Sequence, residues 1–258
     1  MPKVSLICTD LDGTLYSEEM RSDHLLRFRA LLQRASRQWR TRWAIVTGRP
    51  LTDMRPILMD FMTLGMVPDF LVLEDALIHV RNRRGRFAPR RWWNFNVRRQ
   101  RARLFNHHTD IIKNWRREVM RQFPTAVNRG RKMIDLWLEF KDEAQAQAAE
   151  ELLRTLVRDS VHFYIFRWHS ELCLAPKSGT KGQAVDKLGR ILRIPRETIF
   201  AVGDGPNDLT MLDGSVAGMP ACVANALPEI KEAVRRAGGF VAEKDAAKGT
   251  IEALTFYM

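Results

Sequence analysis

The chain has 258 residues, 45% of them hydrophobic, which is enough to bury one large core or two smaller ones. It contains no run of about 18 apolar residues and no long apolar stretch before Asp10, which argues against a membrane span or a secretory signal, so we expect a cytoplasmic protein. The three cysteines are an odd number without a C-x-x-C pair, which argues against a disulfide framework or a zinc site.

The net charge of +12 comes from one segment. Residues 81–132 hold 17 Lys or Arg against Asp110 and Glu118, a local net charge of +15, so the rest of the chain carries −3. The aromatic residues interleaved with these arginines are Trp92, Trp93, Phe95 and Trp115. Three interpretations stay open for this basic segment: contacts to an anionic substrate, binding of a nucleic acid or anionic surface, or an arginine-rich solvated face with the aromatics in a core.

The first predicted element ends in two carboxylates. Val4 to Thr9 is a short apolar run of the kind found in buried parallel strands, and Asp10 and Asp12 follow it in a turn at Gly13. Carboxylates this close repel each other unless a cation neutralises them or one is protonated. Gly13 lets the backbone bend so that successive N–H groups can hold an anion. The local pattern therefore indicates a metal and a phosphate.

A second strand with a polar end follows after one helix. Apolar residues at spacings of three and four predict a helix over 21–40, and Trp43 to Val46 predicts a strand that ends at Thr47-Gly48-Arg49. The next expected elements are a helix over 51–64 and two successive strands over 69–73 and 76–78, with Glu74-Asp75 between the strands.

The basic segment belongs to a block with its own elements. The pattern predicts a long helix over 97–123 and a second helix over 143–157 that Asp142 caps. The expected antiparallel strands cover 133–140, 161–168 and 171–175. Because this block has apolar positions of its own, we expect residues 81–175 to form a small inserted α+β domain.

The alternation of strands and helices resumes after this block. Lys181 stands at the start of a helix that runs to about Leu192, and a strand over 198–202 ends in Gly203-Asp204-Gly205-Pro206-Asn207-Asp208. The last expected elements are a strand over 221–223, a helix over 228–237, a short strand over 240–241 and a helix over 247–256. This alternation predicts an α/β fold whose parallel sheet has helices on both faces and a site at the carboxyl ends of the strands.

Four motifs together resemble those of the haloacid dehalogenase-like (HAD) phosphohydrolases. They are D-x-D-G-T-L from Asp10, Thr47 with Gly48-Arg49, Lys181 at a helix start, and G-D-x-x-N-D from Gly203 to Asp208. The resemblance implies a HAD-like Rossmannoid core in residues 1–80 and 176–258. It also implies that residues 81–175 are a type 2 cap, as in the Cof-like and sucrose-phosphatase-like branch, which closes over the site as a lid and sets substrate specificity.

The resemblance also implies a role for each matching residue. Asp10 attacks phosphorus and forms an aspartyl-phosphate, and Asp12 acts as general acid and then general base. Thr47 and Lys181 complete the catalytic set by holding phosphoryl oxygens. The implied substrate-binding residues are Leu11, Gly13, Gly48, Arg49 and Asn207. The implied Mg²⁺ ligands are Asp10, Asp12 through its carbonyl oxygen, Asp204 and Asp208.

The chain departs from its relatives at one place near this site. They often carry Asn-Gly, close to the phosphate, where this chain has Glu74-Asp75, so two carboxylates stand where a substrate contact is usual.

The predicted function is Mg²⁺-dependent hydrolysis of a small phosphorylated metabolite such as a sugar phosphate. One alternative is a phosphomutase that uses the same aspartates and returns the phosphoryl group to a sugar. The other is a protein that binds nucleic acid or an anionic surface through the basic segment, although nucleic acid is the less favoured partner. We expect no membrane partner.

Overall fold

The computed structural model describes residues 3–16, 22–130, 136–158, 160 and 162–258, and the chain divides into two compact units. The first unit comprises Met1–Asn94 and Thr180–Met258, and the second comprises Phe95–Gly179. The second unit is therefore inserted into the sequence of the first. The expected domain limits at residues 81 and 175, and the role of the insertion as a lid, stay predictions.

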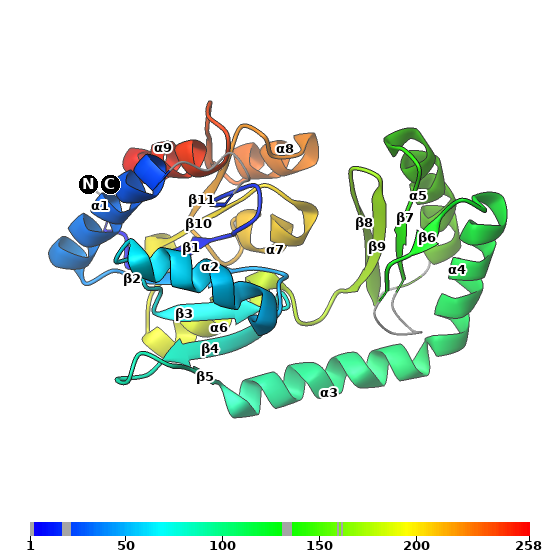
Figure 1. The fold of residues 1–258 in the computed structure, drawn as a ribbon, viewed down its shortest axis with the longest axis horizontal. Coiled ribbons are helices and arrows are strands. Elements are labelled where there is room, and N and C mark those ends of the chain that lie inside the picture. Colours follow the sequence, from blue (N-terminus) through cyan, green and yellow to red (C-terminus); the bar gives the residue numbers. More distant parts are fainter. Residues whose placement is uncertain (1–2, 17–21, 131–135, 159, 161) are drawn as a thin grey trace. The chain divides into compact units, whose positions relative to one another are not determined.

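Within the described residues, the first unit is built on an eight-stranded sheet in the order β12-β11-β10-β1-β2-β3-β4-β5 (Figure 1). Its strands are β1 (Leu6–Thr9), β2 (Arg42–Val46), β3 (Phe70–Leu73), β4 (Leu77–Arg81), β5 (Phe87–Pro89), β10 (Ile199–Gly203), β11 (Met219–Cys222) and β12 (Phe240–Val241). Neighbouring strands from β12 to β3 are parallel. All four residues of β1 are buried, which explains why its sequence is an unbroken apolar run rather than an alternating one.

Two strands at one edge of this sheet differ from the parallel arrangement that the sequence predicts. β4 and β5 are antiparallel to their neighbours, because the chain turns back between β3 and β4 at Glu74 and Asp75. β5, which pairs with β4 in the large sheet, consists of residues that the sequence analysis includes in the block 81–175. The strand is only three residues long and lies among arginines, so it has no alternating pattern to reveal it.

Helices cover both faces of the large sheet. They are α1 (Ser22–Trp39), α2 (Leu51–Thr63), α6 (Lys181–Leu192), α7 (Leu209–Leu212), α8 (Pro228–Arg236) and α9 (Ala246–Tyr257). In Figure 1, α2 lies in front of the sheet and α6 behind it. Contacts join α1 to α9 and α6 to α7. This confirms the predicted α/β fold with helices on both faces.

The second unit has a separate antiparallel sheet with its own core. Its described strands, in the order β6-β7-β9-β8, are β6 (Val127–Asn128), β7 (Trp137–Glu139), β9 (Glu171–Pro176) and β8 (Phe163–Trp168). The core includes Leu138, Leu153, Phe163 and Leu172. Of the strands expected in this block, residues 133–135 and 161 lie outside the described residues. The predicted α+β character of the insertion is confirmed.

The helices of the second unit begin and end at different residues from those predicted. α5 (Glu143–Val157) follows Asp142, whose Oδ1 accepts from the Gln145 amide at 2.8 Å, so the predicted cap is confirmed. The single helix predicted over 97–123 is wrong: the structure has α3 (Arg91–His107) and α4 (Thr109–Gln122), with a break at His108.

The break in the long helix has a local cause. His107, His108 and Thr109 are weaker helix formers than the arginines and alanine before them. The Thr109 hydroxyl also donates to the Phe105 carbonyl oxygen at 2.8 Å, a bond that bends helices. Among the residues that the structure describes, no helix combines the length and apolar character that crossing a bilayer requires.

Candidate active site

Three neighbouring strands deliver the predicted site residues to one edge of the large sheet. Thr9 at the end of β1 is level with Val202 on β10 and with Ile45 on β2, and all three strands run parallel. Their carboxyl ends therefore meet at the same edge, where Asp10, Thr47 and Asp204 follow.

Three carboxylates form a buried cluster at this edge. Asp10, Asp204 and Asp208 each offer an oxygen that lies within 4.8 Å of those of the other two. Their exposed fractions are 6%, 1% and 0%. Carboxylates are seldom buried unless a cation or hydrogen bonds compensate them, so this cluster calls for positive charge.

Lys181 supplies part of that charge. Its Nζ lies 2.6 Å from Oδ1 of Asp10 and 2.6 Å from Oδ1 of Asp208, and the side chain is 1% exposed. Burial alone would lower the pKa of this ammonium group, but the charges of Asp10 and Asp208 outweigh the burial and raise the pKa above its ordinary value. Lys181 therefore stays protonated and bridges the two carboxylates.

One lysine does not neutralise three buried carboxylates. Burial raises the pKa of Asp10 well above its ordinary value, the charge of Asp208 raises it further, and Lys181 opposes the rise. Burial and Asp208 likewise raise the pKa of Asp204 to about 7, against a hydrogen bond from Thr14. A divalent cation bound to these oxygens would favour the ionised forms of both residues.

The turn after β1 fits closely against Asp204. Gly13 has φ +70°, and a Cβ at this position would stand 2.2 Å from Oδ2 of Asp204, so only glycine allows the approach. The Thr14 hydroxyl donates to Oδ1 of Asp204 at 2.8 Å. The Gly13 amide donates to the Tyr16 carbonyl oxygen at 2.9 Å, and this bond uses the N–H that the sequence analysis assigns to the phosphoryl group. The substrate-binding role of Gly13 stays a prediction.

Asp208 is held more firmly than any other member of the cluster. Its Oδ2 accepts from the amides of Asp204 and Gly205 at 3.0 and 2.9 Å, while Oδ1 accepts from Lys181. A Cβ on Gly203 would stand 2.4 Å from Cγ of Asp208, so the end of β10 leaves room for this carboxylate only because Gly203 has no side chain. These contacts fix the position of Asp208 within the loop after β10.

Asp12 lies outside the buried cluster. Its side chain is 47% exposed and forms a bidentate pair with Arg49, with Nε to Oδ2 at 2.8 Å and Nη2 to Oδ1 at 2.7 Å. The hydrogen bonds to Asp12 raise the pKa of Arg49 further, although burial opposes this. Two residues that the sequence assigned to different roles, a general acid and a substrate ligand, are therefore bonded to each other.

The other predicted site residues lie around this edge. Thr47 is 1% exposed, and its Oγ1 accepts from the Arg49 amide at 3.1 Å. Asn207 donates from Nδ2 to Oδ1 of Asp75 at 3.0 Å. Leu11 is fully buried, and its carbonyl oxygen accepts from the Leu15 amide at 2.8 Å. The roles of these residues toward a substrate stay predictions.

Asn225 is a member of the site that the sequence analysis does not name. Its Nδ2 donates to the Gly13 carbonyl oxygen at 2.8 Å and reaches Oδ2 of Asp204 at 3.4 Å, while its Oδ1 accepts from the Ala246 amide at 2.8 Å. It thus joins the loops after β1, β10 and β11. The only signal in the sequence is a polar residue shortly after a strand, which is too common to single it out.

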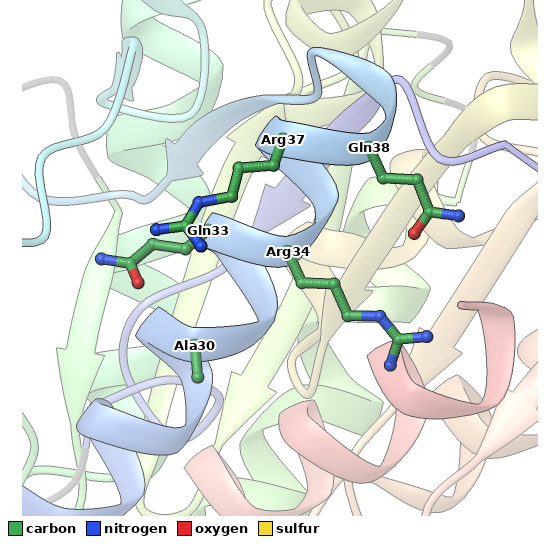
Figure 2. A pocket seen from close by; sticks show the side chains of 5 residues that line it. All are labelled: Ala30, Gln33, Arg34, Arg37 and Gln38. Atoms are coloured by element: carbon green, nitrogen blue, oxygen red, sulfur yellow. The ribbon is translucent and has the colours of Figure 1, made fainter.

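A surface hollow along α1 is not the candidate site. It is lined by Ala30, Gln33, Arg34, Arg37 and Gln38, whose side chains Figure 2 shows projecting from one helix. None of these residues is a carboxylate, and none belongs to the predicted motifs. The chemistry lies instead at the strand ends.

The aromatic residues of the basic segment do not share one environment. Trp115 is 7% exposed and lies in the core of the second unit, whereas Trp92 and Phe95 are 73% and 61% exposed on α3. The aromatics therefore belong only in part to a core. Binding of nucleic acid or an anionic surface through the basic segment 81–132 stays a prediction, and a steep loss of affinity for nucleic acid between low and moderate salt would support it.

Comparison with known proteins gives a match over almost the whole chain. Residues 3–258 match the family model described as sucrose-6F-phosphate phosphohydrolase. A curated relative, phosphoglycolate phosphatase from Metallosphaera sedula, is 30% identical over 237 residues, which cover 88% of this chain and 89% of the relative.

Two solved structures share the fold. The sucrose-phosphatase of Synechocystis sp. PCC6803, in complex with sucrose and phosphate, has a TM-score of 0.70 at 17% identity, and the alignment covers 100% of this chain and 98% of that one. A HAD subclass IIB sugar phosphatase has a TM-score of 0.61 at 16% identity, with 98% of this chain and 99% of that one covered. At these identities the likeness concerns the fold, and it confirms the predicted HAD-like architecture.

Proposed function

The chain belongs to the sucrose-6F-phosphate phosphohydrolase family of HAD-type phosphohydrolases, and from this premise we propose that it is a Mg²⁺-dependent phosphatase that works through an aspartyl-phosphate on Asp10. The proposed substrate is a small phosphorylated metabolite, either a sugar phosphate or a related phosphomonoester. One observation carries the proposal: the buried Lys181 bridges Asp10 and Asp208 at 2.6 Å, in a group that Asp204 completes.

Asp10 is the nucleophile in this proposal. Lys181 donates to its Oδ1, so we assign the attack to Oδ2. A bond forms between Oδ2 and phosphorus while the bond from phosphorus to the ester oxygen breaks, and the leaving oxygen takes a proton from Asp12 and departs as an alcohol. Water then attacks phosphorus and gives a proton to Asp12, and the bond to Oδ2 breaks. The products are the alcohol and inorganic phosphate.

Arg49 controls when Asp12 can act as an acid. Because the guanidinium holds both oxygens of the Asp12 carboxylate, the pair must open and the carboxylate must take up a proton from solvent before Asp12 can donate a proton to the leaving group. Arg binds phosphate with the same two-pronged geometry that it uses for a carboxylate. We therefore assign to the incoming phosphoryl group the task of drawing Arg49 away from Asp12.

The acidic cluster has the donor set that a hard divalent cation requires. Three carboxylate oxygens lie within 4.8 Å of one another, and burial together with the charge of Asp208 raises the pKa of Asp10 and Asp204. Both observations support a bound cation, because positive charge would stabilise the ionised carboxylates. Asp10 and Asp204 would hold Mg²⁺ together with the Asp12 carbonyl oxygen, and Asp208 would help to hold it and fix its neighbours. When bound, Mg²⁺ supplies positive charge to the carboxylates and to the phosphoryl oxygens.

The remaining residues would hold the phosphoryl group during transfer. Thr47 and Lys181 stand beside Asp10 at the same sheet edge, and each has a polar hydrogen to offer to an oxygen whose charge grows in the transition state. Leu11, Gly13, Gly48 and Asn207 are assigned to the same group as substrate-binding residues, and the Gly13 amide must leave the Tyr16 carbonyl oxygen before it can donate to a phosphoryl oxygen.

The family and the relatives point to two kinds of leaving group. The family model names sucrose phosphate, and a solved neighbour is described with sucrose and phosphate, which favours a sugar. The relative from Metallosphaera sedula is named for phosphoglycolate, whose leaving group carries a carboxylate. We favour the sugar phosphate, because the site already holds more negative than positive side chains.

The test is the release of inorganic phosphate from a panel of sugar phosphates, phosphoglycolate and other phosphomonoesters, with Mg²⁺ and with EDTA. The wild type should release phosphate only with Mg²⁺, and Asp10→Asn should lose at least about 10⁴-fold in kcat/KM, the order of loss expected when a covalent nucleophile is removed. Activity that survives in Asp10→Asn would show that another residue is the nucleophile.

The phosphomutase alternative is tested with the same samples. A mutase would move radiolabelled phosphate between positions of a sugar without releasing it, and this exchange would also depend on Asp10. Exchange that exceeds release would assign the chain to the mutases.

A further inference from the structure

The turn between β3 and β4 brings a carboxylate into the candidate site. Oδ1 of Asp75 accepts from Nδ2 of Asn207 at 3.0 Å, and the Asp75 amide donates to the Thr47 carbonyl oxygen at 3.0 Å. A Cβ built on Gly48 would stand 3.5 Å from Oδ1 of Asp75. Asp75 therefore lies between residues that the proposed function assigns to the phosphoryl group.

The backbone at this turn is not the one that these residue types prefer. Glu74 and Asp75 have φ values of +49° and +62°, in the left-handed region that favours glycine and asparagine. Glu74 is exposed, whereas Asp75 is half-buried against Asn207. These φ values, with the hydrogen bond from the Ala76 amide to the Leu73 carbonyl oxygen at 3.0 Å, are those of a tight turn between antiparallel strands, and this turn places Asp75 beside Asn207.

Asp75 adds to a site that is already rich in negative charge. The carboxylates of Asp10, Asp12, Asp75, Asp204 and Asp208 face only the cations Lys181 and Arg49 among the charged site residues named above. With all five carboxylates ionised and one divalent cation bound, these residues carry a net charge of about −1.

We propose that Asp75 is a specificity-determining residue, which rejects phosphomonoesters that carry a second anionic group beside the phosphate and so selects uncharged, hydroxyl-bearing leaving groups. The inference rests on the proposed phosphatase function. Every substrate brings the same phosphate charge, so the repulsion from Asp75 toward the phosphate is common to all of them. Only a second anion on the leaving group makes a difference between substrates.

The Asp75→Asn variant distinguishes the effect of the Asp75 charge from the effect of its hydrogen bonds and backbone conformation. Asp75→Asn keeps an oxygen that accepts from Asn207, suits the left-handed backbone, and removes only the charge. The matched control is Glu197→Gln, which removes an equal charge from an exposed residue just before the amino end of β10, at the opposite edge of the sheet. A further variant, Glu74→Gln, tests whether any negative charge in this turn, rather than that of Asp75, causes the selection against a second anionic group.

The experiment compares two esters that differ in one group, 2-hydroxyethyl phosphate and 2-phosphoglycolate, with the full chain and Mg²⁺. The ratio of their kcat/KM values should shift toward phosphoglycolate by about 10-fold in Asp75→Asn, a change that corresponds to about 1.4 kcal/mol of transition-state energy. Glu197→Gln should leave the ratio unchanged. A shift below about 2-fold in Asp75→Asn, or an equal shift in Glu74→Gln, would overturn the assignment to Asp75.

Binding provides a readout that does not depend on turnover. Calorimetry with 3-phosphonopropionate and propylphosphonate, which cannot be hydrolysed, should show that Asp75→Asn tightens binding of the first more than of the second. Equal effects on both phosphonates would contradict the role of Asp75 alone. Loss of the expected selectivity together with Asp10-dependent turnover would contradict only the role of Asp75, whereas binding with the expected selectivity but without Asp10-dependent turnover would contradict only the phosphatase mechanism.

Discussion

The buried ion pairs of the first unit and the exposed ion pairs on the helices of the second unit have opposite surroundings. In the first unit, Lys181, Asp10 and Asp208 are buried and bonded to one another, although they come from strand ends and a helix start far apart in the sequence. In the second unit, pairs such as Arg154 with Glu150 lie one helical turn apart on the outside of an apolar core.

Burial distinguishes charged groups that belong to a candidate site from charged groups that only cover the surface. Buried charges lose their hydration, and a fold keeps them only where other interactions compensate, so the buried cluster indicates a site. Exposed pairs along one helix keep most of their water and contribute little to stability. The basic segment looks prominent in the sequence, but its ion pairs resemble the second kind.

The largest effect on stability should come from Lys181. In Lys181→Met the carboxylates of Asp10 and Asp208 lose their buried partner, and we expect a loss of about 3–5 kcal/mol in the free energy of unfolding, measured in urea with EDTA. Mg²⁺ should recover part of the loss, because it supplies positive charge to the same oxygens. Lys187→Met, on the same helix but beside the Trp93 ring, is the control and should change little. An equal loss in both variants would contradict the comparison.

A somewhat smaller loss should follow from a cavity in the core of the second unit. Leu153 is fully buried, and Leu153→Ala should cost about 2–5 kcal/mol. Hydrogen exchange should become faster in β8 while β10 stays protected, since the strands belong to different units. Equally faster exchange in both strands would show that the two units unfold as one, and would break the comparison.

The buried cluster should also make stability depend on pH. The pKa of Asp204 rises from 3.8 to about 7 on folding, so its stabilising contribution is complete below about pH 4 and is lost as the pH rises through about 7. The amide in Asp204→Asn cannot ionise. In EDTA, the Tm of this variant relative to that of the wild type should therefore increase as the pH rises from about 4 to about 7. Mg²⁺ should reduce the gap by stabilising the wild type. A gap that does not change with pH would show that Asp204 is already ionised in the fold.

The smallest effect should come from the exposed pair in the second unit. Arg154 contacts Glu150 at 2.6 Å, but its side chain is 60% exposed, and Glu150 also pairs with Arg167 at 3.0 Å. Arg154→Ala should therefore lower the free energy of unfolding by less than about 1 kcal/mol, measured in urea. A loss as large as that of Lys181→Met would remove the distinction between buried and exposed charges.

Much of this protein could be predicted because its signals are local. The apolar run before Asp10, the turn residues after it and the Asp142 cap each lie within a few residues of one another, and each has the structure expected. Sequence patterns did not predict two features that depend on only one to three residues. The hydroxyl of Thr109 helps to end one helix and begin another, and three residues from Phe87 to Pro89 form a strand without an alternating pattern.

The sequence by itself determined the α/β fold and the motif residues at the strand ends, since strand periodicity and turn chemistry are properties of neighbouring residues. Only the tertiary structure decided the partners of those residues. Lys181 meets Asp10 across 171 positions, Asn207 meets Asp75 across 132, and Asn225 meets Gly13 across 212. Such contacts follow from the parallel order of β10, β1 and β2, which brings distant segments to one edge of a sheet, and no local pattern records that order.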